Sequence, residues 1–93
     1  MSAFTFEQFE TANRAKGFDE ILQREWKPGT RLDTHTHPFA VEALVVDGEM
    51  WLSYGDETRH LQPGDAFALA KEMPHAERYG AQGTVFWAAR KHG

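Results

Sequence analysis

The segment from residue 29 to residue 48 reads GTRLDTHTHPFAVEALVVDG and says most about the fold of this chain. His35 and His37 lie two residues apart, so on an extended strand both imidazoles point to the same face. The nearly continuous apolar run 40–46 predicts a strand that is covered on both faces. It ends at Asp47-Gly48, a pair that favours a two-residue hairpin because both residues tolerate positive φ. The segment therefore predicts antiparallel strands with two histidines side by side.

Short strands separated by turn residues continue on both sides of this segment. Glycine or proline marks most of their boundaries, and the stretch 80–83 predicts a further turn. The strands expected are 21–26, 30–37, 40–46, 49–54, 58–61, 66–70 and 84–89. A parallel sheet would need crossover helices, for which the chain has no room, so the pattern predicts an all-β antiparallel sandwich or barrel.

The N-terminal segment predicts a helix over residues 5–16. Thr5 and Gln8 have the spacing of a capping box, in which each side chain bonds the backbone N–H of the other residue. Two phenylalanines of the segment lie three residues apart and share one face. Gly17 is a suitable helix stop. We therefore expect a short helix ahead of the barrel.

The composition limits the chain to one hydrophobic core. Its 93 residues predict a helical segment at 1–17 and a barrel domain at 18–93. Ten Lys and Arg against 14 Asp and Glu make no large basic face, so we expect no nucleic-acid partner. The absence of cysteine excludes disulfides, thiolate metal ligands and a cysteine nucleophile. No run approaches the ~20 apolar residues of a spanning helix, and the N-terminus lacks signal-peptide features, so we expect a cytoplasmic protein with no membrane partner.

Several residues of the chain, taken in combination, resemble the two motifs of the cupin superfamily. The matching positions are Gly29, His35, His37, Glu42 and Gly48, followed by Pro63-Gly64-Asp65 and Pro74-His75. The resemblance runs from about Trp26 to the C-terminus and implies a small jelly-roll β-barrel that holds one divalent metal ion. The metal ligands that it implies are His35, His37, Glu42 and His75.

The carboxylate ligand has alternative positions. Cupins with this spacing of histidines and glycine usually place the glutamate one residue earlier, where this chain has Val41. Such a slip turns the side chain to the opposite face, so Glu42 enters the barrel only if a bulge near residues 39–40 restores its phase. Without that bulge the site consists of the three histidines. Glu77 shares the face of His75 if that segment is extended, and we interpret it as a rim or surface acid, with a ligand as the alternative.

The implied donor set limits the metal and the pocket around it. Imidazoles with at most one carboxylate suit iron, nickel, zinc, manganese or copper, and they do not suit magnesium or calcium. Three or four protein ligands leave positions on a six-coordinate ion for water, substrate or O₂. The substrate-binding residues expected on the apolar wall are Met50, Leu52, Tyr54, Phe67 and Trp87, with Phe86 as an alternative to the last two.

Three functions are compatible with such a site. The first is a metal-dependent enzyme with dioxygenase-like or Lewis-acid chemistry on a small organic molecule. The second is a non-catalytic ligand sensor; since the sequence carries no helix-turn-helix reader, a regulator of this kind would act through a partner. The third is a purely structural metal site. We rank the enzyme first, and the sequence names neither the metal nor the substrate.

An apolar outer face predicts a second subunit. Trp51 faces away from the side of its strand that carries Met50, so we expect it to pack against the N-terminal helix or a partner. Val45 is expected on the outer face as well. Because a metal and its pocket reduce the volume left for packing inside so short a chain, we expect a homodimer.

Overall fold

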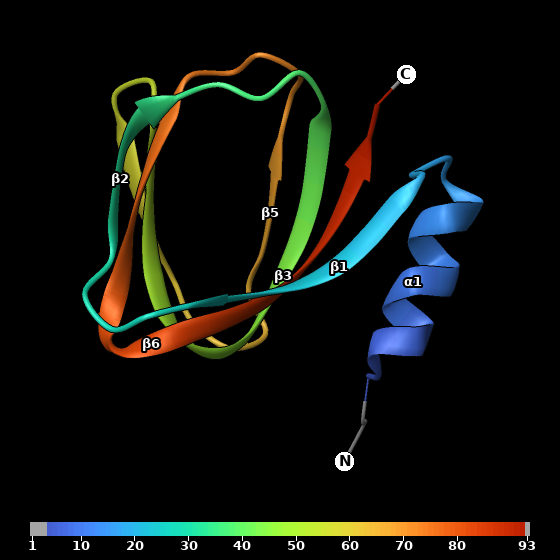
Figure 1. The fold of residues 1–93 in the computed structure, drawn as a ribbon, viewed down its shortest axis with the longest axis horizontal. Helices are drawn as coiled ribbons and strands as arrows, with labels where there is room; N and C mark the ends of the chain where they lie inside the picture. The colour runs from blue at the N-terminus through green and yellow to red at the C-terminus, as the bar shows by residue number, and fades with distance from the viewer. Residues whose placement is uncertain (1–3, 93) are drawn as a thin grey trace.

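The computed structural model describes residues 4–92, which form one helix and a six-stranded antiparallel sheet (Figure 1). The elements are α1 (Phe6–Ala15), β1 (Glu20–Trp26), β2 (Arg31–His35), β3 (Ala40–Tyr54), β4 (Glu57–Leu61), β5 (Ala66–Leu69) and β6 (His75–Lys91). The predicted all-β jelly-roll barrel with a short N-terminal helix is confirmed. Within the described residues, no helix has the length and apolar character required to cross a membrane.

The two longest strands, β3 and β6, pair with each other over most of their length. β1 pairs with the second half of β6, and β2 pairs with its first half. In the same way, β4 pairs with the second half of β3, and β5 pairs with its first half. Each long strand therefore pairs with two short strands, one along each half of its length. The two long strands bend together, so the sheet curves around an interior (Figure 1).

Two segments predicted as turns lie inside the long strands. β3 runs through Asp47-Gly48, and its register against β6 shifts on both sides of that pair. Gly48 has φ +73, and a Cβ added to it would overlap the carbonyl oxygen of Gly83, which itself has φ +80. The predictions of a hairpin at 47–48 and a turn at 80–83 are therefore wrong. The positive φ angles of Gly48 and Gly83 belong to β-bulges, at which the two long strands bend together.

One row of side chains from each strand fills the interior. On β3 the inward row is Val41, Ala43 and Val45 and, after the bulges, Met50 and Leu52. The expectation that Val45 lies on the outer face is wrong: the side chain is 0% exposed, because strand alternation puts it in phase with Val41. The buried cluster consists of Val41, Ala43, Val45, Met50, Leu52, Leu61, Phe67, Leu69, Tyr79, Phe86 and Ala88.

The predicted N-terminal helix is confirmed together with its capping box. Gln8 N donates to Thr5 Oγ1 at 3.1 Å, and Thr5 N donates to Gln8 Oε1 at 2.9 Å. The helix lies outside the barrel, where Phe6 and Phe9 contact the ring of Trp87 with centroid distances of 5.6 and 5.9 Å. Trp87 therefore faces away from the barrel interior and holds the helix against β6.

Trp51, by contrast, does not contact the helix. Its ring stacks on His60 at 4.7 Å, and the guanidinium of Arg78 lies 4.1 Å above the ring centroid. Of the two expected contacts of Trp51, that with the N-terminal helix is thus wrong, because β3 carries Trp51 on a different part of the outer surface, and that with a partner stays a prediction.

Replacing Trp87 by alanine should detach α1. We expect the free energy of unfolding to fall by about 2 kcal/mol or more, because the helix loses most of its aromatic contact with the sheet. Urea unfolding followed by far-ultraviolet circular dichroism measures this loss. Trp51→Ala is the matched control: it removes the same side chain from another part of the outer surface. An equal loss in both variants would contradict the assigned role of Trp87.

Candidate metal centre

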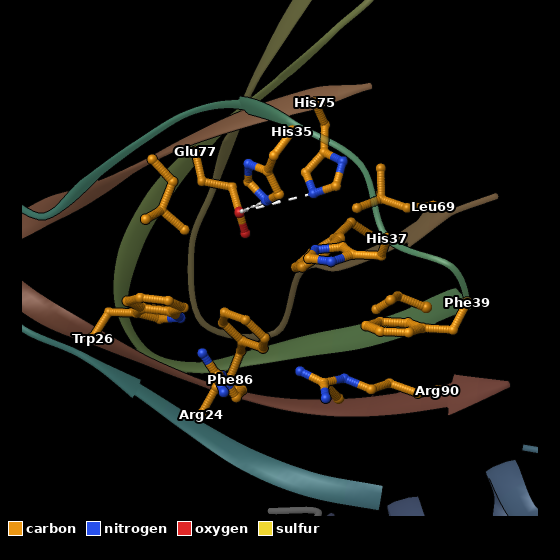
Figure 2. Close-up of a pocket in the computed structure, with 14 residues that line it drawn as sticks. Arg24, Trp26, His35, His37, Phe39, Leu69, His75, Glu77, Phe86 and Arg90 are labelled. Carbon is orange, nitrogen blue, oxygen red and sulfur yellow. Dashed lines mark ion pairs between the residues drawn. The ribbon is translucent and has the colours of Figure 1, made fainter. Parts of the chain in front are cut away.

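Three histidines from two strands meet at one end of the barrel. His35 ends β2, His37 follows it two residues later, and His75 begins β6 opposite His35 in the strand register. One ring nitrogen from each can be chosen such that all three lie within 4.8 Å of one another. Figure 2 shows the three imidazoles along the same side of a pocket. The two strands thus bring together donors that are 40 residues apart in sequence, from His35 to His75.

Hydrogen bonds to the backbone orient two of the three rings. His35 Nδ1 lies 2.6 Å from the carbonyl oxygen of Asp33, and His75 Nδ1 lies 2.8 Å from that of Met73. A carbonyl oxygen only accepts, so each Nδ1 carries a proton, and Nε2 is the ring nitrogen that remains for a metal ion. A hydrogen bond from Nδ1 to a backbone carbonyl oxygen fixes the orientation of a histidine ring that binds a metal through Nε2.

The buried end of the cluster contains a polar atom without a partner. The His75 side chain is 2% exposed, and its Nε2 has no hydrogen-bond partner among residues 4–92. Burying such an atom unpaired costs about 1–3 kcal/mol. Burial, and then the charges of His75 and His35, lowers the pKa of His37 and favours its neutral, metal-binding form. An unpaired buried Nε2 beside two further imidazoles fits a transition-metal ion.

Glu77 lies beside these imidazoles with its side chain 8% exposed, which differs from the surface or rim position preferred above. Its Oε2 is 3.3 Å from His35 Nε2 and 3.9 Å from His75 Nε2 (Figure 2). Its Oε1 accepts a hydrogen bond of 2.7 Å from the hydroxyl of Tyr79. Burial, and then the neighbouring Glu77, raises the pKa of Tyr79, which therefore remains protonated and donates.

Glu42 does not reach the histidines. Its side chain is 37% exposed, and its carboxylate lies 3.2 Å from Lys16 Nζ, on the side of β3 that faces the N-terminal helix. Val41 takes the inward position next to it and lines the pocket. The bulges of β3 come after Val45, too late in the strand to change the phase of Glu42. The expected position of Glu42 at the histidines is thus wrong, and the carboxylate that lies beside them is that of Glu77.

The pocket beside the histidines is a cavity of about 90 Å³. It is lined by Arg24, Trp26, Leu32, His35, His37, Phe39, Val41, Phe67, Leu69, His75, Glu77, Phe86, Ala88 and Arg90. Of the expected substrate-binding residues, Phe67 lines it. Met50 and Leu52 are fully buried in the core, Tyr54 packs against that core, and Trp87 lies on the outer face under the helix.

Three charged residues of the cavity lining, Arg24, Glu77 and Arg90, were not predicted from the sequence to lie there. Strand alternation was the available signal in each case. His75, Glu77 and Tyr79 lie two apart on β6, so they share one face. Arg24 lies between Leu22 and Trp26 in the inward row of β1 by the same rule.

Comparison with known proteins supports this architecture and a ligand-binding role. Residues 17–89 match the family model described as the AraC-like ligand binding domain. An uncharacterized HTH-type transcriptional regulator from Haemophilus influenzae is 40% identical over 38 residues, which are 41% of this chain and 13% of that protein.

Solved structures agree in fold. An RmlC-like cupin from Shewanella frigidimarina superposes with a TM-score of 0.69 at 18% identity, over 78% of this chain and 65% of that one. The polyketide cyclase RemF from Streptomyces resistomycificus superposes with a TM-score of 0.67 at 25% identity, over 86% of this chain and 60% of that one. The chain therefore spans less than two thirds of each of these proteins.

Proposed function

The chain belongs to the family of AraC-like ligand-binding domains, with a cupin fold, and we propose that its ligand is a small organic molecule on which it acts as a metal-dependent enzyme. The observation that carries the proposal is the convergence of His35, His37 and His75 with one buried, unpaired Nε2. The adjoining cavity supports it, because a ligand in that cavity would lie next to the metal.

We propose that Glu77 completes the metal site. Two donor atoms about 2.1 Å from one ion, at 90–110° to each other, are roughly 3.0–3.4 Å apart. The 3.3 Å between Glu77 Oε2 and His35 Nε2 agrees with that spacing. Three imidazoles and one carboxylate suit iron, nickel, zinc, manganese or copper. Such an ion would supply Lewis acidity, and a redox-active ion would also supply oxygen chemistry.

The remaining residues of the site would bind and orient the substrate. The Tyr79 hydroxyl holds Oε1 of Glu77 and so directs Oε2 toward the histidines. Phe67 and Phe86 contact each other with ring centroids 5.6 Å apart and give the cavity an apolar wall. A partly apolar molecule would fill this space and exclude water from the centre.

Exchanging Glu77 for glutamine should weaken metal binding by about 100-fold or more, because the amide is neutral and binds cations less well than a carboxylate. Tyr79→Phe should weaken it by about tenfold through loss of the orienting hydrogen bond. Competition with a chromophoric chelator measures both affinities. Glu42→Gln is the matched control, since that side chain lies outside the cavity, and it should bind metal as the wild type does. A larger loss in Glu42→Gln than in Glu77→Gln would reject the proposed ligand.

Enzymatic activity itself requires a separate test. Oxygen consumption and product formation are measured with small organic substrates, using metal-loaded protein and the same protein after chelation. The proposal expects turnover that depends on the metal and disappears in His37→Ala. Turnover that persists without metal would contradict it.

A second candidate function is a ligand sensor without catalysis. It is favoured by the family match and by the similarity to part of a transcriptional regulator. In this case the chain would bind its ligand tightly without turnover and would act on a DNA-binding domain or partner. Binding without turnover, together with recovery of such a partner by affinity purification, would favour the sensor over the enzyme.

A further inference from the structure

Two arginines face the metal centre from the opposite side of the cavity (Figure 2). Arg24 comes from β1 and lies over the ring of Trp26, with 4.7 Å from its Cζ to the ring centroid. Arg90 comes from β6 and lies over Phe39, also at 4.7 Å. Each guanidinium therefore rests against an aromatic wall while it borders the same cavity.

Both arginines occupy positions that normally hold apolar residues. Arg24 is in the inward row of β1, next to Trp26, and Arg90 follows Phe86 and Ala88 in the inward row of β6. Charged residues are seldom placed on the inner face of a small barrel without a partner. A ligand is one such partner.

Nearby carboxylates balance the positive charges of Arg24 and Arg90 only in part. Arg90 Nη1 is 3.3 Å from Glu20 Oε1, a carboxylate that is 45% exposed. Arg24 has no carboxylate within 4.0 Å among residues 4–92. Glu77 is the acidic residue of the cavity lining, and it lies at the histidines. Because a guanidinium stays charged at any ordinary pH, the wall attracts an anion.

We propose that Arg24 and Arg90 form a carboxylate-binding subsite and that the ligand is a short organic acid with a second oxygen atom. The carboxylate would bind the guanidiniums, and the second oxygen, a hydroxyl or keto group, would face His35, His37 and His75. A cavity of about 90 Å³ is smaller than the ~150 Å³ that holds a benzene molecule, so the acid is short. Only one part of this inference rests on the proposed function: the placement of the second oxygen atom of the ligand at the histidines.

The test compares short hydroxy acids with their neutral amides by calorimetry on metal-loaded protein. The probes are glycolate, 3-hydroxypropanoate and 4-hydroxybutanoate, each with its amide. At least one acid should bind about tenfold more tightly than its amide, the size expected for one charge-assisted hydrogen bond. Arg24→Gln and Arg90→Gln should each lose about tenfold in affinity for the acid and should keep the affinity for the amide.

Two further variants separate a binding role from a structural one. Arg78→Gln is the matched control: this arginine also lies over a tryptophan, Trp51, but on the outer surface, and its loss should leave the acid affinity unchanged. Arg24→Lys keeps the charge and should retain part of the preference for the acid. Equal binding of every acid and its amide by the wild type would overturn the proposal. So would an undiminished preference in the Arg24→Gln, Arg90→Gln double variant.

The same titrations on chelated protein distinguish this proposal from the proposed function. If the protein binds no metal but still prefers the acids, and the arginine variants lose that preference, the subsite holds and the metal-dependent enzyme fails. If metal binds and no acid is preferred, the metal site holds and the carboxylate subsite fails.

Discussion

Replacing His75 by alanine should abolish metal binding. We expect a stoichiometric metal in the wild type and almost none in the variant after desalting. His75 is the most buried of the three histidines, and its Nε2 is the atom left without a partner. Loss of this ligand should exceed the 10- to 100-fold effect typical of outer-shell partners. Elemental analysis gives the stoichiometry, and chelator competition gives the affinity.

His60→Ala is the control for this experiment. His60 lies on the outer surface, where its Nε2 is 2.6 Å from Glu49 Oε1 and its ring stacks on Trp51. Its removal should leave the metal content unchanged. Circular dichroism of both variants ensures that loss of metal is not loss of fold. An equal metal content in folded His75→Ala and in the wild type would contradict the proposed metal site.

Replacing Gly48 by alanine should prevent stable folding. The new Cβ would overlap the carbonyl oxygen of Gly83 and approach the Cα of Thr84 to 3.1 Å, so the two central strands could not keep their spacing. The positive φ of Gly48 adds about 1 kcal/mol of backbone strain for alanine. We expect the free energy of unfolding to fall by about 4 kcal/mol or more, a large share of the 5–15 kcal/mol typical of a domain. Urea unfolding measures the change.

Gly29→Ala separates the overlap from the strain. Gly29 has φ +70, close to that of Gly48, and a Cβ there would meet nothing within 4 Å. This variant should lose about 1 kcal/mol and retain the fold. Similar losses in the two variants would show that backbone strain, and not the contact between β3 and β6, sets the requirement for glycine at position 48.

The helix was predictable because its signals are local. Thr5 and Gln8 satisfy each other within one turn, and Gly17 adopts φ +93 immediately after the helix. Neither feature requires knowledge of the rest of the chain. The aromatic partner of the helix was not predictable. Trp87 lies more than 70 residues away, and the sequence does not say whether its side chain points into the barrel or outward.

The bends of the barrel were not predictable from local signals. Glycine with positive φ suits both a hairpin turn and a bulge. At Asp47-Gly48 the choice depends on the carbonyl oxygen of Gly83, which approaches from across the sheet and fits because Gly48 has no Cβ. β6 also continues through residues 80–83, where composition alone favours a turn, and it pairs with β3 on both sides of them.

For the site, strand alternation and motif spacing were sufficient to select His35, His37 and His75. Alternation assigns neighbours to faces but does not say which face is inside. That is decided by packing across the sheet: Val41 enters the barrel with Ala43, and Glu42 is turned toward Lys16. Glu77 reaches the histidines because β6 pairs with β2 at this end. The residue types thus predicted a metal site, and the pairing of distant strands determined which carboxylate and which arginines lie near the three histidines, since only that pairing relates the inward rows to one another.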